Sequence, residues 1–176
     1  MKRFILDYSL KNGLGNPAIS LYLSGCDKKI KCKGCHNQEL QLGTNAKIDF
    51  ELLKENMDKN IKNYLYFHKK LHVSILGGEP LAPYNREIAN QISKYIKQKY
   101  KDCSIILYSY RTIDDIKKEN LLSYLTYIDY GVLGSFEEDL FIENTLPSST
   151  NQYIYDFKNK TKLQSISLKG GIKHAI

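Results

Sequence analysis

The sequence predicts an α/β fold in the form of an open, partial parallel β/α barrel. Segments with strand character alternate with segments of helical periodicity along most of the 176 residues, and such alternation implies parallel strands joined by right-handed crossovers. Residues 18–23 are almost wholly apolar, as expected of a strand that is buried on both faces. The chain is too short for a complete eight-unit barrel, which needs roughly 250 residues.

The N-terminal part is predicted to hold two strands and one long helix. A short first strand leads through a loop rich in glycine and proline to the apolar strand. The helix is predicted from apolar residues that recur at three- and four-residue steps, and Asp49 can cap its start. These elements are the strand 3–8, the loop 12–17, the strand 18–23 and the helix 49–66.

The remaining elements continue the alternation. Ile88, Ile92 and Ile96 form one stripe of a second helix. Thr112 with Asp115 has the spacing of a capping box, which predicts a third helix as far as Leu122. In order, we expect a strand at 72–76, a helix at 85–100, a strand at 104–108, a helix from 112 to 122, a strand at 127–133, and weaker strands at 151–155 and 163–168.

Composition sets limits on location and partners. Lys and Arg number 26 and Asp and Glu 19, which gives a formal charge of +7 and a pI near 9.1. This charge permits a nucleic-acid partner, but the lysines are spread over predicted helix faces, so a solvated surface is the simpler interpretation. No stretch approaches the roughly 20 apolar residues that span a bilayer. The first apolar run, 4–6, is shorter than a secretory signal requires. We therefore expect a cytoplasmic protein without a membrane or nucleic-acid partner.

Three of the four cysteines lie close together. Cys26, Cys32 and Cys35 fall within ten residues, directly after the carboxyl end of the apolar strand. In a reducing compartment such a cluster indicates metal or redox chemistry rather than disulfides. Cys103 stands alone before its strand, so we expect it at the opposite end of the sheet as a buried structural thiol.

A second unusual segment is predicted to lie at the same end of the sheet. Gly77-Gly78-Glu79-Pro80 follows the carboxyl end of the strand 72–76, and ligands of parallel α/β folds collect at that end. Glycine has no Cβ and lets a ligand approach the strand edge closely, while Glu79 could accept a hydrogen bond from an ammonium group. The two segments together predict one ligand site.

Three ligands suit three clustered thiolates. A zinc ion would need a fourth protein ligand, for which His36 is available but adjacent to Cys35. A four-iron cluster would keep one iron open for another ligand. Residues 32–36 also match the attachment pattern of c-type haem, although that chemistry belongs to exported proteins.

The motifs resemble those of the radical S-adenosylmethionine (SAM) enzymes, and among them the activating enzymes of anaerobic ribonucleoside-triphosphate reductase. The resemblance extends over about residues 12 to 155. Two departures stand out: five residues separate Cys26 from Cys32 where three are usual, and Leu133 replaces an aspartate. The matching segments are NGLG at 12–15, SGC at 24–26, CKGCHN at 32–37, LGGEPL at 76–81, DYGVLGSFEEDL at 129–140 and SSTNQ at 148–152.

The resemblance implies a partial barrel of the radical SAM type, with one domain over 1–155 and a C-terminal extension over 156–176. Cys26, Cys32 and Cys35 would ligate a [4Fe–4S] cluster whose open iron binds SAM. The implied contacts to SAM are made by Gly34, His36, Gly77, Gly78, Glu79 and Ser109. No side chain is assigned a role as catalytic acid, base or nucleophile.

The resemblance also implies a reaction and its partners. A reduced one-electron donor such as flavodoxin would supply the electron for cleavage of SAM. The resulting 5′-deoxyadenosyl radical would abstract hydrogen from a glycine of the reductase and leave a glycyl radical there. Two alternatives stay open: a radical SAM enzyme that modifies RNA or a peptide, and a zinc-stabilised nucleic-acid-binding module without catalysis.

Overall fold

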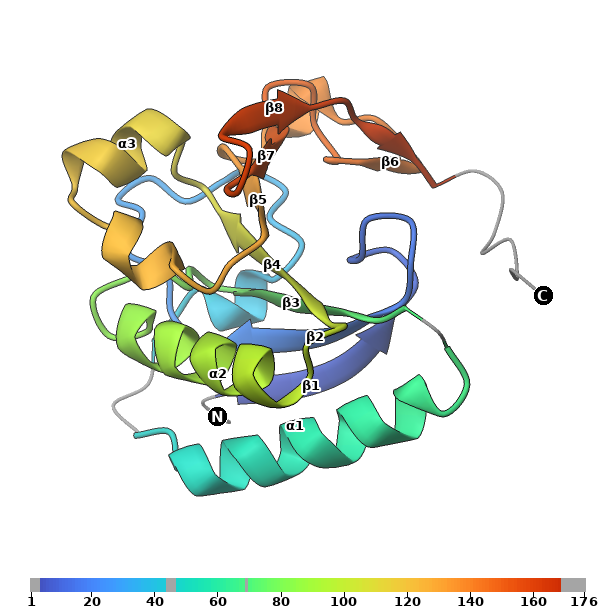
Figure 1. The fold of residues 1–176 in the computed structure, drawn as a ribbon. Coiled ribbons are helices and arrows are strands. Elements are labelled where there is room, and N and C mark those ends of the chain that lie inside the picture. The colour runs from blue at the N-terminus through green and yellow to red at the C-terminus, as the bar shows by residue number, and fades with distance from the viewer. Residues whose placement is uncertain (1–3, 44–46, 69, 169–176) are drawn as a thin grey trace.

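The computed structural model describes residues 4–43, 47–68 and 70–168. Its main element is a seven-stranded sheet with the order β1-β2-β3-β4-β5-β7-β8 (Figure 1). The strands are β1 (Phe4–Ser9), β2 (Ala18–Leu23), β3 (His72–Gly77), β4 (Ser104–Ser109), β5 (Tyr130–Leu133), β7 (Tyr153–Asp156) and β8 (Thr161–Leu163). A separate pair is formed by β6 (Thr145–Leu146) and β9 (Ile166–Ser167).

The predicted α/β class and its parallel centre are confirmed. Strands β2, β3, β4 and β5 pair in parallel, whereas β1, β7 and β8 pair antiparallel with their neighbours. Over the described residues the sheet is open, because β1 and β8 are its two edges and do not pair with each other. The parallel centre places the carboxyl ends of β2 and β3 side by side.

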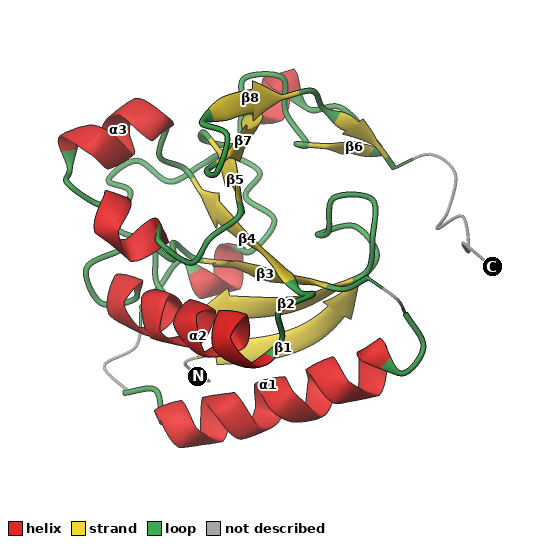
Figure 2. Ribbon diagram, viewed as in Figure 1, coloured by secondary structure: helices red, strands yellow, loops and turns green. Residues whose placement is uncertain are grey.

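Three helices cover one face of the sheet. They are α1 (Phe50–Leu65), α2 (Arg86–Lys99) and α3 (Ile113–Lys118). Figure 2 shows α1 and α2 next to each other against the strands. Their buried residues recur at the predicted steps, as Leu53, Met57 and Ile61 do on α1. Alternate strand residues such as Ile19 and Ile105 join them in the main core, so the helical stripes were a sound guide to burial.

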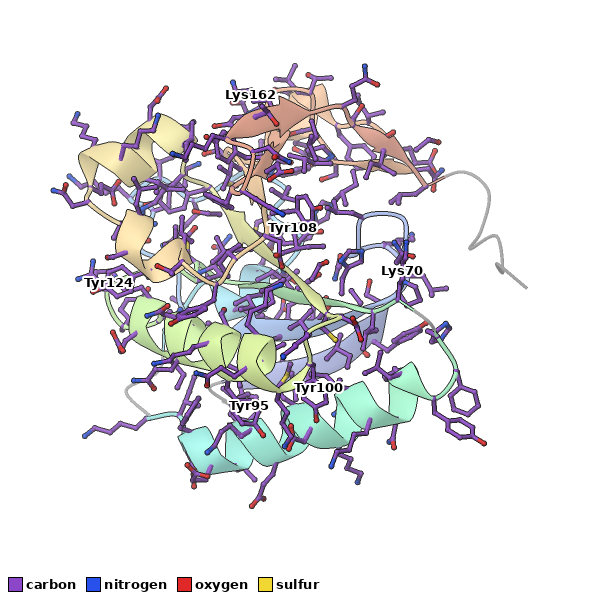
Figure 3. All side chains as sticks on the ribbon, in the orientation of Figure 1. Lys70, Tyr95, Tyr100, Tyr108, Tyr124 and Lys162 are labelled. Carbon is purple, nitrogen blue, oxygen red and sulfur yellow. The ribbon has the colours of Figure 1, made fainter. Side chains whose placement is uncertain are left out.

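A polar cluster joins α1 to α2 at the edge of this core. Tyr95 and Tyr100 lie between the two helices (Figure 3). Their hydroxyls donate to Asp58 on α1 at 2.9 and 2.8 Å, and Lys99 pairs with the same carboxylate. These bonds lower the pKa of Asp58 although partial burial opposes them. Asp58 therefore fixes the position of α2 relative to α1.

The boundaries of the later elements differ from the prediction. Thr112 and Asp115 do form the capping box, but α3 ends at Lys118 rather than Leu122. Asn120 adopts a left-handed conformation with φ of 57°, which is a usual way for a helix to end. A short 3-10 turn, Leu122–Leu125, follows, and β5 begins only at Tyr130.

The C-terminal segment continues the fold beyond the weaker predicted strands. The strand expected at 151–155 is β7, and the segment 163–168 is divided between the end of β8 and β9. Cys103 is 1 % exposed in the main core, just before β4, which confirms its predicted burial. Residues 169–176 lie outside the described part of the chain. Among the described helices, none has the length and apolar character needed to cross a membrane.

The other face of the sheet is covered by the loop that follows β1. Figure 1 shows this loop and β6 on the side of the strands away from α1 and α2. The Asn12 amide donates to Ser20 Oγ at 2.9 Å and to the Tyr22 hydroxyl at 3.1 Å. The Asn12 carbonyl accepts from Ser74 Oγ and from the Tyr108 hydroxyl. One asparagine thus binds β2, β3 and β4, and it also lines the cavity on this face of the sheet.

We predict that Leu53→Ala, on the core side of α1, lowers the free energy of unfolding by about 2–5 kcal/mol, because it leaves a cavity in the main core. Leu53 is 0 % exposed, whereas its neighbour Leu52 is 48 % exposed. Leu52→Ala is the matched control and should cost less than about 1 kcal/mol. Urea unfolding of both variants measures the difference, and equal losses would contradict the assigned helix orientation.

Candidate iron–sulfur and cofactor site

The ends of β2 and β3 are joined by backbone hydrogen bonds. The Gly78 amide donates to the Leu23 carbonyl, and the Glu79 amide donates to the Gly25 carbonyl, both at 2.7 Å. The buried Asn85 side chain donates to the carbonyls of Ser24 and Glu79 at 3.1 and 2.9 Å. We call these contacts the β2–β3 junction. It fixes where the cysteine-containing loop leaves the sheet.

Glycine is required in the β2–β3 junction because the two backbones approach each other closely. A Cβ on Gly78 would lie 2.0 Å from the Gly25 carbonyl oxygen, and one on Gly77 would lie 2.5 Å from the Leu23 backbone. Gly77 also has a φ of 117°, a conformation that favours glycine. The paired glycines therefore serve the junction itself, in addition to leaving the end of β3 without side chains.

The cysteine loop, residues 25–41, closes on itself at its base. The Gly25 amide donates to the Leu40 carbonyl at 2.7 Å and the Cys26 amide to the Gln41 carbonyl at 3.1 Å. A short 3-10 turn, Gln38–Leu40, ends the loop and buries Leu40. The loop is thus a closed unit attached to the carboxyl end of β2, as its position in the sequence predicts.

The predicted site residues gather around one cavity of about 470 Å³. Its volume falls within the range of cofactor pockets. Figure 3 shows Tyr108, which contributes to its floor, on β4 in the middle of the sheet. The predicted residues that line it are Cys32, Cys35, His36, Gly77, Gly78, Glu79 and Ser109. The lining does not include Cys26 or Gly34.

The three thiols share one loop but do not form a ligand set for a single ion. All four cysteines are free, and Cys26, Cys32 and Cys35 are partly exposed. Within the described ranges, no group of three His, Cys, Asp or Glu side chains could hold a metal ion, so the zinc set with His36 is not assembled. In a four-iron cluster each cysteine binds a different iron. Its sulfurs can therefore stand further apart than the ligands of one ion.

The donor set fits such a cluster. Soft thiolates suit iron–sulfur centres, and three thiols on a short closed loop would leave one iron without a protein ligand. Burial raises the pKa of the Cys26 thiol, against a backbone hydrogen bond from Lys28 and the charge of Lys31. Binding of a metal would remove this thiol's proton.

Gly34 and His36 connect the cysteine loop to the segment after β5. Gly34 has a φ of 66°, and a Cβ there would meet the Glu138 carboxylate at 2.8 Å. The His36 ring lies 4.7 Å from that of Phe136 and 6.4 Å from that of Phe141. The segment from 136 to 141 therefore forms an aromatic wall of the cavity beside the cysteines.

Glu79 and Ser109 form a buried network with Arg111. The Glu79 carboxylate accepts from the Leu81 amide, Ser109 Oγ and the Tyr110 amide at 2.9, 2.8 and 3.1 Å. Arg111 Nη1 lies 3.5 Å from it. Burial outweighs these donors and raises the pKa of Glu79 to about 7. In this structure the Glu79 carboxylate and the Ser109 hydroxyl are thus engaged with the protein.

Arg111 is a site residue that no sequence motif predicts. Its side chain is 5 % exposed and pairs with Asp27 at 2.7 Å and with Glu119 at 2.8 Å. Asp27 directly follows Cys26, so this arginine ties the cysteine loop to the turn between β4 and α3. No local pattern points to this contact, because Asp27 and Arg111 are 84 residues apart.

Comparisons with known proteins find one family and several relatives to which this chain is similar. Residues 11–155 match the family described as the 4Fe-4S single cluster domain. The chain is 28% identical over 144 residues to the anaerobic ribonucleoside-triphosphate reductase-activating protein of Enterobacteria phage T4, covering 82% of this chain and 86% of that protein. The protein of the same name from Pasteurella multocida is 28% identical over 153 residues, covering 83% and 90%. That from Haemophilus influenzae is 27% identical over 148 residues, covering 84% and 92%.

These relatives confirm the resemblance that the motifs predict. The matched region begins just before the Asn12 loop and ends within β7. It contains every residue that lines the cavity except Leu168. No solved structure matches the chain significantly.

Gly78→Ala should lower the free energy of unfolding by about 1–3 kcal/mol, because its Cβ would overlap backbone atoms that cannot move independently. Gly43→Ala is the matched control, since its Cβ would meet only the Gly25 Cα at 3.7 Å. We expect it to change stability by less than about 1 kcal/mol. Denaturant unfolding compares the two, and a Gly78→Ala protein of unchanged stability would refute the close approach.

Stability should also depend on Glu79 and pH. Its pKa rises from an ordinary 4.5 to about 7 in the folded protein, so the folded state binds this proton more tightly than the unfolded state. The free energy of unfolding should then fall by about 3 kcal/mol as pH rises from about 4.5 to 7. Glu79→Gln should remove this part of the pH dependence.

Urea titrations at several pH values test this assignment. Glu119→Gln is the control, because it removes another partner of Arg111 and leaves Glu79 intact. It should keep the fall in stability with pH. An unchanged pH dependence in Glu79→Gln would show that another group is responsible.

Proposed function

The chain belongs to the 4Fe-4S single cluster domain family, and we propose that it is a radical SAM activase that generates a glycyl radical on anaerobic ribonucleoside-triphosphate reductase. One observation carries this proposal: Cys32, Cys35 and the Gly77–Gly78 strand end line the same cavity. The relatives that cover more than four-fifths of the chain are named as activating proteins of that reductase.

The cysteine loop is the proposed cluster-binding element. Cys26, Cys32 and Cys35 would hold a [4Fe–4S] cluster through their thiolates, with the loop base fixed by the β2–β3 junction. Held there, the cluster would supply the single electron needed to break the carbon–sulfur bond of SAM. The protein's own task is to hold the ligand at the strand end and to keep water away.

The SAM-binding residues are proposed from the lining of the cavity. Gly77, Gly78 and Glu79 would receive the methionine amine at the bare end of β3. The backbone would serve this purpose because the Glu79 carboxylate is engaged elsewhere. His36, packed against Phe136, would lie beside the adenine together with Gly34. Ser109 would approach the ribose or carboxylate only by exchanging its bond to Glu79.

Exposed apolar residues at the edge of the cavity favour a macromolecular substrate over a small one. Phe141 and Ile142 line it and are 50 % and 40 % exposed. Large apolar side chains at the edge of a pocket are typical of a surface that a protein partner covers. The open sheet, which we propose to be the partial barrel of a radical SAM domain over 1–155, leaves this side accessible. A reduced one-electron donor such as flavodoxin would supply the electron for the reaction. We propose that the reaction takes place in the cytoplasm.

The test is anaerobic reconstitution followed by iron and sulfide analysis. We expect about four irons per chain, cleavage of SAM to 5′-deoxyadenosine with a reductant, and a glycyl electron-spin signal on added reductase. Cys26→Ala, Cys32→Ala and Cys35→Ala should each lose the cluster and SAM cleavage. Cys103→Ala, at the other end of β4, should retain both.

Three results would contradict the proposal in different ways. Zinc without iron in the reconstituted protein would favour the nucleic-acid-binding alternative. SAM cleavage that RNA stimulates, with no signal on the reductase, would favour a modifying enzyme. Loss of iron in Cys103→Ala but not in Cys26→Ala would exclude the proposed ligands.

A further inference from the structure

The five residues between Cys26 and Cys32 form an ordered part of the site. Their first member, Asp27, accepts from both terminal nitrogens of Arg111, at 3.3 and 2.7 Å. The Arg111 side chain is almost fully buried and is held in turn by Glu119. The start of this longer connection is therefore fixed against the turn after β4.

Lys28 contacts two of the three clustered thiols. Its ammonium group donates to Cys32 Sγ at 3.2 Å, and its backbone is hydrogen-bonded to the Cys26 thiol. The same ammonium lies 5.9 Å from the centre of the Tyr110 ring, and that ring also faces the Arg111 guanidinium at 4.6 Å. Lys28 is thus placed between an aromatic ring and a cysteine sulfur rather than extended into solvent.

The other lysines of the connection have different partners. Lys31 donates to the Cys26 carbonyl at 2.5 Å, and Lys33 pairs with Glu138 at 3.1 Å. Lys29 is exposed. Within the described cysteine loop, the side-chain hydrogen bond from a lysine to a cysteine sulfur comes from Lys28 alone.

A cation that donates to a ligand sulfur changes the energy of a redox centre. Reduction adds one negative charge to an iron–sulfur cluster, and a nearby positive charge or a hydrogen bond to sulfur stabilises that charge. The effect is strong for a direct contact, whereas an exposed charge at longer range is screened by water and salt. Lys28 has the direct contact and Lys29 does not.

We propose that Lys28 is a positioning residue that holds Cys32 and raises the reduction potential of the cluster bound by this loop. This inference rests on the proposed function. One electron passes from a reduced one-electron carrier to the oxidised cluster, so that the carrier loses the electron and the cluster gains it, with no bond formed or broken in that step. Lys28 makes this transfer more favourable by stabilising the added charge next to Cys32.

The five-residue spacing between Cys26 and Cys32 makes both of these contacts possible. A connection of five residues has room for Asp27 to reach Arg111 while Lys28 turns back to Cys32. The Lys28–Cys32 contact places a positive charge beside the thiol, and the Asp27–Arg111 contact holds the loop in position. The cost of a longer loop in closure entropy is small, so such a connection can be accommodated by the same sheet end.

The test is a redox titration of the reconstituted full-length protein, followed by the electron-spin signal of the reduced cluster. Lys28→Met should lower the ratio of reduced to oxidised cluster at fixed potential about tenfold, equivalent to about 59 mV for a one-electron couple. Lys28→Arg, which keeps the charge and a donor, should stay within about threefold of the parent. Lys29→Met is the matched control, removing the same charge one residue away, and should change the ratio less than twofold.

The outcomes separate this inference from the proposed function. A normal cluster and normal SAM cleavage in the parent, with equal ratios in Lys28→Met and Lys29→Met, would overturn the role of Lys28 alone. A higher ratio in Lys28→Met would overturn it as well. A parent protein that takes up no iron would overturn the proposed function, and this inference with it. Iron analysis and circular dichroism of each variant exclude loss of cluster or fold as the cause of a shift.

Discussion

The β2–β3 junction is the constraint on which the site depends. Two backbone hydrogen bonds join Gly78 to Leu23 and Glu79 to Gly25, and they form only because a side chain is missing at Gly78. The junction sets the point where the cysteine loop leaves β2 and the direction in which β3 ends. The cysteine loop and the bare end of β3 can face one cavity because backbone hydrogen bonds join them beside it.

A buried arginine extends this constraint across the sheet. Arg111 follows β4 and contacts Asp27 in the cysteine loop, Glu79 after β3 and Glu119 after α3. A buried charge is tolerated when it is paired and hydrogen-bonded, and loss of its partners is costly. The same arrangement explains why Glu79 lies almost fully buried in a segment that the sequence marks as a ligand site. Its carboxylate organises the strand ends, and its backbone remains at the cavity.

The cavity is completed by segments far from the cysteines in sequence. Asn12 lies on the face of β2, β3 and β4 that is away from the helices, and it binds all three strands. The segment from 136 to 141 stands beside the cysteine loop through the His36–Phe136 ring contact and the Lys33–Glu138 ion pair. The helices take no part in this wall, since they pack on the opposite face. The fold thus separates a core packed under the helices from a face on which loops line the cavity.

The sequence by itself determined the order of strands and helices, the burial of β2, the stripe of α1 and the meeting of the cysteines with Gly77 and Gly78 at one end of the sheet. Each of these follows from local periodicity and from the geometry of parallel strands, which a single chain segment encodes. The end of α3 at Lys118 and the late start of β5 were predicted wrongly, because a left-handed Asn120 leaves no trace in the hydrophobic pattern.

Only the tertiary structure decided what surrounds the thiols. Arg111 meets Asp27 across 84 residues, and Tyr108 meets Asn12 across 96, so neither pair has a signature in sequence spacing. The reason why residues 77 and 78 must be glycine is likewise a contact with another strand. The hydrogen bond from Lys28 to the Cys32 sulfur depends on how the cysteine loop folds back on itself. Such contacts arise from packing between distant segments, and that information is absent from any local stretch of the chain.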